Sequence, residues 1–176
     1  MKRIAFFLFV FLSVNVNALF AQDIIMTNTS VVQGITEDSR AFYDPGGQNG
    51  DFGLGIRDTL TMRNSMSGQG TLSVIFDDFA MGYGDTLYVF DSQTCDPNHL
   101  IGFYNSVNSP EEVSTVSGYL TFVFHSDSIH DYGMLKSGWV ARAYVTPANP
   151  DQLWLNSDNQ GLTMTSCNFK FYDSGG

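Results

Sequence analysis

The strongest constraint on the fold of this chain is a hydrophobic pattern with a period of two residues. Successive side chains of a β-strand point to opposite faces, so alternating apolar residues predict a strand with one buried face. Four segments show this alternation: Leu72, Val74 and Phe76; Leu87 and Val89; Leu120, Phe122 and Phe124; and Trp139, Ala141, Ala143 and Val145. No window shows the spacing of an amphipathic helix.

Clusters of turn-forming residues separate these segments. They are Asp44–Gly47, Ser65–Gly70, Gly82–Gly84 and Asn105–Pro110, at the spacing that short antiparallel strands require. The 17 glycines and the 14% aromatic content also favour β structure. We therefore expect an all-β fold, an antiparallel two-sheet β-sandwich whose inward faces are the apolar stripes.

The charge balance excludes one class of partner. The chain has 8 Lys and Arg against 18 Asp and Glu, a formal charge of −10 and a pI near 4.3. Nucleic acid binding needs a basic surface that releases counterions, so we expect no nucleic acid partner. An anionic membrane is disfavoured for the same reason, whereas an excess of carboxylates suits extracellular Ca²⁺.

The N-terminus predicts export. Residues 1–21 begin with Lys2 and Arg3, continue through an apolar run from Ile4 to Leu12 and end at Ala21, as a secretory signal peptide does. A membrane span needs about 20 predominantly apolar residues, so we expect no membrane insertion. The mature chain then starts near Gln22 and is secreted or lies at the cell surface.

The C-terminal part predicts a second domain. Pro147 and Pro150 disfavour a central strand, so residues 147–152 are interpreted as a linker. The octapeptide Arg40–Gly47 is then echoed by Phe169–Gly176, displaced by 129 residues. We expect residues 153–176 to be the truncated start of a second copy, within a larger multidomain chain.

Two cysteines, Cys95 and Cys167, stand far apart in the sequence. They could bridge in an oxidising compartment, but Cys167 lies beyond the predicted linker and could equally pair within the following domain. The sequence leaves both pairings open.

Six motifs follow one another along the chain: Phe42–Gly47, Leu72–Phe79, Asp85–Asp91, Leu100–Tyr104, Leu120–Asp127 and Gly138–Tyr144. In this order they resemble a CUB domain, in particular one of the bacterial extracellular type. The resemblance spans roughly residues 24 to 146 and defines a domain at 22–146. It implies a CUB-like jelly roll that binds proteins or glycans and has no catalytic activity, so we expect no enzyme.

The resemblance also implies a calcium site, with departures from the family pattern. Calcium-binding CUB domains use a Tyr, a Glu and two Asp at one end of the sandwich. Only the two Asp carry over, onto Asp85 and Asp127; the Glu position falls at about Gly82 and the Tyr position at about Phe52. The usual disulfides of vertebrate CUB domains are absent, and Asn105 stands where one of their cysteines would be.

Ca²⁺ takes six to eight oxygen ligands, so two Asp are too few and Asp77 or Asp78 must contribute as well. Alternation from Phe76 predicts Asp77 on the outward face and Asp78 on the inward one. The predicted metal ligands are therefore Asp85 and Asp127, together with one of the two candidates Asp77 and Asp78. The alternative is that these carboxylates only cap turns by accepting backbone N–H groups.

Other chemistry is less well supported. His125, Ser126, Asp127 and His130 lie close in sequence, but neighbours along a strand point to opposite faces, so His125 cannot easily activate Ser126. A zinc site on the two histidines lacks a third ligand. The aromatic residues Phe103, Tyr104, Tyr83 and Tyr132 fall in or beside loops, where they could contact a sugar or a protein or simply pack.

The sequence thus predicts a secreted, non-catalytic binding or adhesion module that recognises an extracellular protein or glycan, with Ca²⁺ as its expected cofactor. The alternative is a jelly-roll carbohydrate-binding module of a secreted glycosidase or peptidase.

Overall fold

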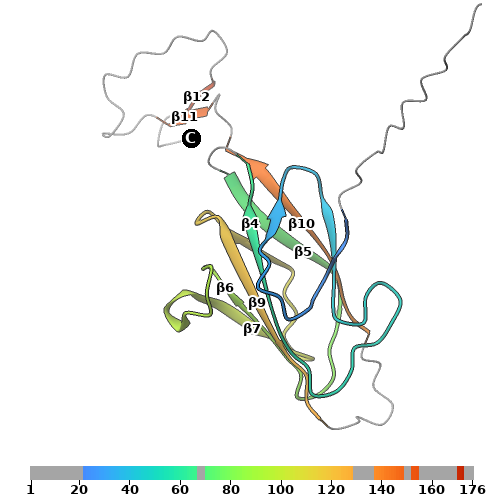
Figure 1. Cartoon of the computed structure of the whole chain (residues 1–176). Coiled ribbons are helices and arrows are strands. Elements are labelled where there is room, and N and C mark those ends of the chain that lie inside the picture. The colour runs from blue at the N-terminus through green and yellow to red at the C-terminus, as the bar shows by residue number, and fades with distance from the viewer. Residues whose placement is uncertain (1–21, 67–69, 129–136, 149–151, 155–169, 173–176) are drawn as a thin grey trace, which may run out of the picture.

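The described part of the chain consists almost entirely of strands (Figure 1). The computed structural model describes residues 22–66, 70–128 and 137–148, and the backbone of residues 152–154 and 170–172. The elements are β1 (Ile24–Ile25), β2 (Gln33–Ile35), β3 (Arg40–Tyr43), β4 (Arg57–Asn64), β5 (Gly70–Ala80), β6 (Thr86–Phe90), the 3₁₀ turn η1 (Pro97–His99), β7 (Leu100–Tyr104), β8 (Glu112–Thr115), β9 (Tyr119–His125), β10 (Gly138–Pro147), β11 (Gln152–Trp154) and β12 (Lys170–Tyr172).

Two five-stranded sheets form the sandwich. Their strand orders are β1-β3-β10-β5-β8 and β2-β4-β9-β6-β7, and Figure 1 shows β5 and β10 running together in one layer with β4, β9 and β6 in the other. The β-sandwich expected from the alternating pattern is confirmed.

The pairing is mixed rather than wholly antiparallel. Two edge pairs, β1 with β3 and β2 with β4, are parallel, and the other pairs within the two sheets are antiparallel. The first four strands alternate between the sheets, so the chain returns to each sheet after two crossings and runs in its earlier direction. A parallel pair needs such a crossover, because a tight turn joins only antiparallel neighbours.

The core lies between the sheets and contains every apolar stripe expected from the sequence. Leu72, Val74, Phe76, Leu87, Val89, Leu120, Phe122, Phe124, Trp139, Ala141, Ala143 and Val145 are all buried. Burial of apolar surface of this kind is the main favourable term in folding.

Aromatic rings join the two sheets around Trp139. Its ring centroid lies 5.6 Å from Phe42 and 5.3 Å from Phe124, and Phe42 lies 5.1 Å from Phe122. The tilted and edge-on arrangements are those that aromatic pairs prefer. This cluster fixes the end of the sandwich where β10 begins.

The two ends of the sandwich differ in chemistry. At one end, here called the acidic end, β3, β5 and β9 finish and β4, β6 and β10 start, and Asp44, Asp85 and Asp127 follow or precede these strands. At the other, here called the distal end, β4 and β10 finish and β5 and β9 start.

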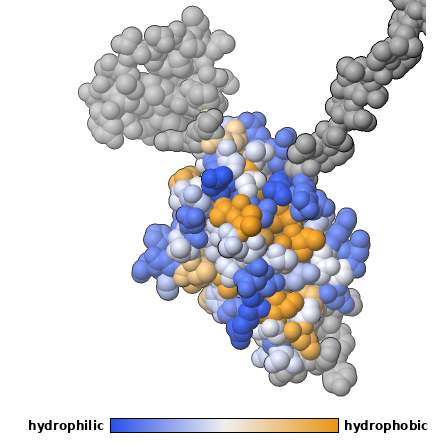
Figure 2. Space-filling view, viewed as in Figure 1, coloured by the Kyte–Doolittle hydropathy of each residue, from blue (hydrophilic) through white to orange (hydrophobic). Residues whose placement is uncertain are grey.

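The outer surface is mixed in polarity. In the view of Figure 2, hydrophobic residues form several small patches separated by hydrophilic ones. Among the described residues, none of the helical segments is long and apolar enough to cross a membrane.

Candidate functional site

The acidic end is organised by Asp85, a fully buried carboxylate directly before β6. Its Oδ1 accepts a hydrogen bond from the backbone N–H of Asp127 at 2.9 Å, and its Oδ2 accepts one from the backbone N–H of Gly82 at 2.9 Å. A buried carboxylate is tolerated when it is hydrogen-bonded in this way. The structure therefore brings two predicted ligands, Asp85 and Asp127, together.

The loop before Asp85 fits closely against Asp127. Gly84 has a φ of +91°, and a Cβ added to it would lie 2.9 Å from Asp127 Oδ2. Only glycine satisfies both the left-handed backbone and this close approach. The 82–84 loop thus packs directly against the half-buried Asp127 side chain.

Asp77 is engaged in a different contact. Arg142 on β10 donates two hydrogen bonds to its carboxylate, Nε to Oδ2 at 2.7 Å and Nη2 to Oδ1 at 2.8 Å. Hydrogen bonding by the Arg142 guanidinium lowers the pKa of Asp77 from its ordinary value. The pair is exposed, and bidentate Arg–carboxylate geometry of this type is favourable.

Strict alternation from Phe76 predicts that Asp78 points inward, and this prediction is wrong. The β5–β10 register pairs Phe76 with Ala141 and Asp78 with Val140, so Asp77 is an extra residue in a β-bulge. Because the bulge shifts the alternation by one residue, Asp77 and Asp78 are both exposed. The Asp78 carboxylate accepts a hydrogen bond from the backbone N–H of Phe79 at 2.9 Å.

The described residues do not complete a calcium site by themselves. In residues 22–66, 70–128 and 137–148 no group of three or more His, Cys, Asp or Glu side chains could hold a metal ion. Asp85 and Asp127 remain as two candidate carboxylates, and Asp131, in the loop after Asp127, lies outside the described residues.

Asp44 is a buried carboxyl group that the sequence analysis treated only as part of a turn. Its Oδ1 accepts the N–H of Gly46 at 2.6 Å and its Oδ2 accepts the N–H of Trp139 at 3.2 Å. Burial nonetheless raises the pKa of Asp44 to about 6, with the nearby Asp51 charge adding to the effect. The position of Asp44, directly after a buried strand and before Pro-Gly-Gly, is the sequence feature that could have indicated this buried carboxyl group.

Gly138 makes room for the Asp44 carboxyl. Its φ is +69°, and a Cβ there would lie 2.2 Å from Asp44 Cγ. The first residue of β10 therefore has to be glycine for β3 and β10 to meet around this buried acid.

His125 and Ser126 point in different directions, as expected for neighbours at a strand end. Ser126 Oγ donates to the Gly53 carbonyl at 2.9 Å and accepts from the Ile56 N–H at 2.8 Å. The His125 Nδ1 lies 3.2 Å from Arg57 Nη1 on the neighbouring strand. A serine nucleophile donates its hydroxyl proton to a general base, whereas the Ser126 hydroxyl donates to a backbone carbonyl and holds the 53–56 loop. His130 lies outside the described residues.

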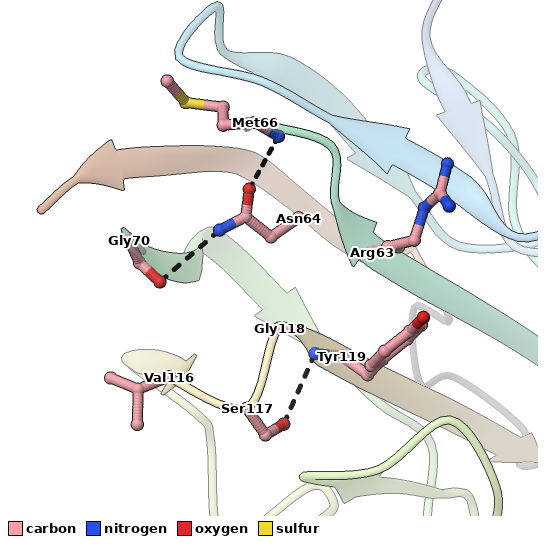
Figure 3. A pocket seen from close by; sticks show the side chains of 8 residues that line it. All are labelled: Arg63, Asn64, Met66, Gly70, Val116, Ser117, Gly118 and Tyr119. Carbon is pink, nitrogen blue, oxygen red and sulfur yellow. Dashed lines mark hydrogen bonds between the residues drawn. The ribbon is translucent and has the colours of Figure 1, made fainter. Parts of the chain in front are cut away.

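A shallow groove, which the sequence analysis missed, lies at the distal end (Figure 3). Its volume is about 380 Å³, and it is lined by Arg63, Asn64, Met66, Gly70, Val116, Ser117, Gly118 and Tyr119. The Asn64 side chain accepts a hydrogen bond from the Met66 N–H at 2.9 Å and donates one to the Gly70 carbonyl at 3.5 Å. Arg63 is exposed and makes no ion pair within the described part of the chain.

The remaining predicted residues are dispersed. Tyr83 and Phe103 are exposed, at 74% and 53% of their full accessible surface, and Tyr104 is partly buried, which raises the pKa of its hydroxyl. Cys95 is exposed and forms no disulfide with another described residue. Tyr132 and Cys167 lie outside the described residues, so the pairing of the two cysteines stays a prediction.

Sequence comparison finds no matching family model and no matching curated protein. Structure comparison finds CUB domains. The CUB1-EGF-CUB2 region of human MASP-1/3 is 15% identical with a TM-score of 0.52, and the match covers 68% of this chain and 43% of that one. The full extracellular region of zebrafish Gpr126/Adgrg6 is 16% identical with a TM-score of 0.50, covering 69% and 15%.

A single CUB domain gives a nearly complete match in length. The MASP-1 CUB2 domain, solved bound to Ca²⁺, is 16% identical with a TM-score of 0.48, and the match covers 64% of this chain and 96% of that domain. The chain spans less than half of the MASP-1/3 region and of the Gpr126/Adgrg6 extracellular region. At these identities the comparisons establish the fold alone: strands β1 to β10 form a CUB-like β-sandwich.

Proposed function

We propose that this chain is an exported, non-catalytic binding module that recognises an extracellular protein or glycan through the loops of its acidic end. The observation that carries the proposal is the Asp127–Asp85 contact of 2.9 Å, which holds a partly exposed carboxylate beside the 82–84 loop on a rigid sandwich. Binding residues are commonly placed on loops that a rigid scaffold positions.

Calcium dependence is the finer part of the proposal. Asp127 and Asp85 would supply the carboxylate oxygens, while carbonyls, water and side chains outside the described residues would complete the coordination that Ca²⁺ requires. Bound Ca²⁺ would neutralise charge on a chain of −10 and offer a cation to an acidic ligand group. Asp77 is the weakest of the four candidate ligands, because Arg142 already holds its two oxygens.

The proposal that the module is non-catalytic rests on the hydrogen bonds that the polar side chains of the acidic end make to the backbone. Ser126 bonds two backbone groups, Asp85 bonds two more, and Asp44 accepts from Gly46 and Trp139. These side chains stabilise loops, and none of them contacts His125 in a nucleophile–base pair.

We further propose that the module is the first of a tandem pair. In the first domain, β1 and β3 are parallel and Ile24 pairs with Phe42; β11 and β12 are also parallel and Leu153 pairs with Phe171. Both partners of the second pair lie 129 residues after their counterparts, and the same displacement relates the repeated octapeptides. Agreement between sequence repeat and strand register supports a second copy. Tandem copies would raise avidity through effective concentration.

Thermal unfolding tests the calcium site. In about 5 mM CaCl₂, a site with the affinity typical of extracellular modules adds roughly 2 kcal/mol, which raises Tm by about 5 °C or more. Asp127→Asn should abolish the shift. Asp38→Asn, an equal loss of charge at an exposed site near the distal end, should keep it. Equal Tm values for the wild type in CaCl₂ and in chelator would remove calcium from the proposal.

The binding function is tested with the exported chain on arrays of extracellular proteins and glycans, with and without chelator. We expect at least one ligand whose signal falls in Asp127→Asn and persists in Asp38→Asn. Chemical conversion of a bound ligand, or ligand signals identical in both variants, would contradict a non-catalytic module that binds through the acidic end.

Hydrogen exchange tests the tandem arrangement. Amides of residues 152–154 should be protected in the wild type and lose protection in Lys170→Pro, with no change in residues 22–146. Equal exchange rates of residues 152–154 in the wild type and in Lys170→Pro would contradict the β11–β12 pairing that supports a second copy.

A further inference from the structure

Four side chains form a continuous row across the outer face of the sheet β2-β4-β9-β6-β7. They are Phe103 on β7, Tyr88 on β6, His125 on β9 and Arg57 on β4, and these four strands are successive neighbours. We call them the outer-face row. Tyr88 is paired with Phe103 in the β6–β7 register, and Arg57 is paired with His125 in the β4–β9 register.

Each member of the row contacts the next. The ring centroids of Tyr88 and Phe103 are 6.4 Å apart, and those of Tyr88 and His125 are 5.7 Å apart. Arg57 Nη1 lies 3.2 Å from His125 Nδ1. The residues next to them in sequence, Leu87 and Phe124, are fully buried, which places the row on the opposite, solvent-facing side of the sheet.

Arg57 is the charged end of the row. It is exposed, and in the described part of the chain it has no ion pair, although the sequence carries 18 acidic side chains. Burial and the Arg57 charge lower the pKa of His125. The guanidinium thus presents donors in a fork that matches a carboxylate or a sulfate.

The dimensions of the row favour an extended sugar chain. Neighbouring strands are about 4.8 Å apart, so four strands span roughly 15 Å from Phe103 to Arg57. One strand spacing is close to the length of one sugar ring, and exposed aromatic rings offer flat apolar faces to the C–H faces of such rings. Phe103, at the far end from Arg57, is 53% exposed.

A folded protein partner fits this surface less well. Stable protein interfaces cover about 800 Å² on each partner and have an apolar centre. The row is narrow, ends in a charge and is flanked by Thr59 and Thr86, which are only partly exposed. An extended peptide adding to the free edge of β7 would lie along the strand rather than across it.

We propose that the outer-face row binds an acidic oligosaccharide, with the acid group on Arg57 and successive sugar rings on His125, Tyr88 and Phe103. This site lies on the outward face of the sheet. Arg57 and His125 stand where β4 begins and β9 ends, so the row borders the acidic end, but it uses none of the carboxylates of the proposed function. Neither assignment depends on the other.

Calorimetry with the full chain tests the proposal after a screen of uronate-bearing and sulfate-bearing oligosaccharides. The probes are tetragalacturonate, its neutral methyl ester and a tetraglutamate peptide, together with the best acidic oligosaccharide from the screen. Arg57→Gln and Phe103→Ala each remove one end of the row. Their controls are Arg63→Gln, on the same face of β4 about 20 Å away, and Val107→Ala, at an exposed apolar loop residue.

We expect the acidic oligosaccharide to bind, the neutral ester to bind about tenfold more weakly or not at all, and both row variants to lose about tenfold in affinity. Arg63→Gln and Val107→Ala should bind as the wild type does. The assignment is overturned if no acidic oligosaccharide binds, if the row variants bind as the controls do, or if the peptide binds and the sugars do not. Arg57→Gln and Phe103→Ala replace none of the predicted calcium ligands, and the calcium-dependent shift in Tm is measured without any sugar, so failure here is distinct from failure at the acidic end.

Discussion

The backbone N–H of Asp127 donates a hydrogen bond to Asp85 Oδ1 over 2.9 Å, and this contact joins the end of β9 to the loop before β6. The second oxygen of Asp85 holds the N–H of Gly82 in the same loop. One buried carboxylate thereby fixes both segments that carry the acidic end of the CUB-like sandwich.

Replacing Asp85 should destabilise the domain through these two bonds. In Asp85→Ala both N–H groups lose their acceptor, and each unsatisfied donor costs about 1–3 kcal/mol, so we expect a loss of roughly 2–6 kcal/mol. Urea unfolding measures it. Asp38→Ala, at an exposed position, should change stability by less than about 0.5 kcal/mol. Equal midpoints for the two variants would show that Asp85 does not hold the loops.

Gly55 and Gly138 both have a left-handed backbone, but only Gly138 lies against Asp44. Comparing an alanine substitution at each glycine therefore separates the cost of crowding Asp44 from the cost of backbone strain. Gly55 has a φ of +66° and an added Cβ would meet nothing within 4 Å, whereas at Gly138 it would lie 2.2 Å from Asp44 Cγ. Gly55→Ala should therefore cost only the left-handed backbone term of about 1–2 kcal/mol. We expect Gly138→Ala to cost clearly more in the same unfolding assay, and a smaller cost than for Gly55→Ala would contradict the packing.

The pKa of Asp44 predicts how stability varies with pH. Burial raises this pKa to about 6 in the folded state, above its ordinary value of 3.8, so the folded protein binds the proton more tightly than the unfolded chain does. The contribution of Asp44 is thus fully present below about pH 4 and is lost as pH rises to about 6, by roughly 2–3 kcal/mol.

Chemical unfolding at pH 4, 5, 6 and 7 checks this dependence. The wild type and Asp44→Asn should differ in the slope of their unfolding free energies with pH, because the amide has no proton to lose over this range. Parallel curves for the two proteins between pH 4 and pH 6 would contradict a raised pKa at Asp44.

Ser126 should prove structural. Its hydroxyl bonds both Gly53 and Ile56, so Ser126→Ala should lower the free energy of unfolding by about 1–3 kcal/mol. Ligand binding measured below the melting temperature should persist in this variant. A hydrolytic activity present in the wild type and absent from Ser126→Ala would contradict the account.

The alternating pattern determined the sandwich because its signal is redundant. Each core stripe repeats over several residues, and one substitution along Leu120, Phe122 and Phe124 would not hide it. The parallel pairs carried no comparable signal: β1 has two residues and β2 has three, and their direction depends on crossings between sheets rather than on local sequence.

The candidate site was predicted less completely, for local reasons. The resemblance placed Asp85 and Asp127 together, and the structure brings them into contact. The bulge at Asp77 shifts the alternation by one residue, so Asp78 faces outward. A single extra residue does not show in the hydrophobic pattern of the sequence, so this shift could not be predicted. Asp44 was missed because burial of a turn residue depends on β10 and Gly138, which lie far away in sequence.

The most direct test of the account is a titration of the ¹⁵N-labelled exported chain with CaCl₂, followed by amide NMR. We predict saturating shifts at millimolar Ca²⁺ concentrated at Gly82, Gly84, Asp85 and Asp127, with the distal-end amides of Asn64, Gly70 and Ser117 unchanged. Shifts that are absent, or that are as large at the distal end as at the acidic end, would contradict the central claim that the carboxylates of the acidic end form the binding site.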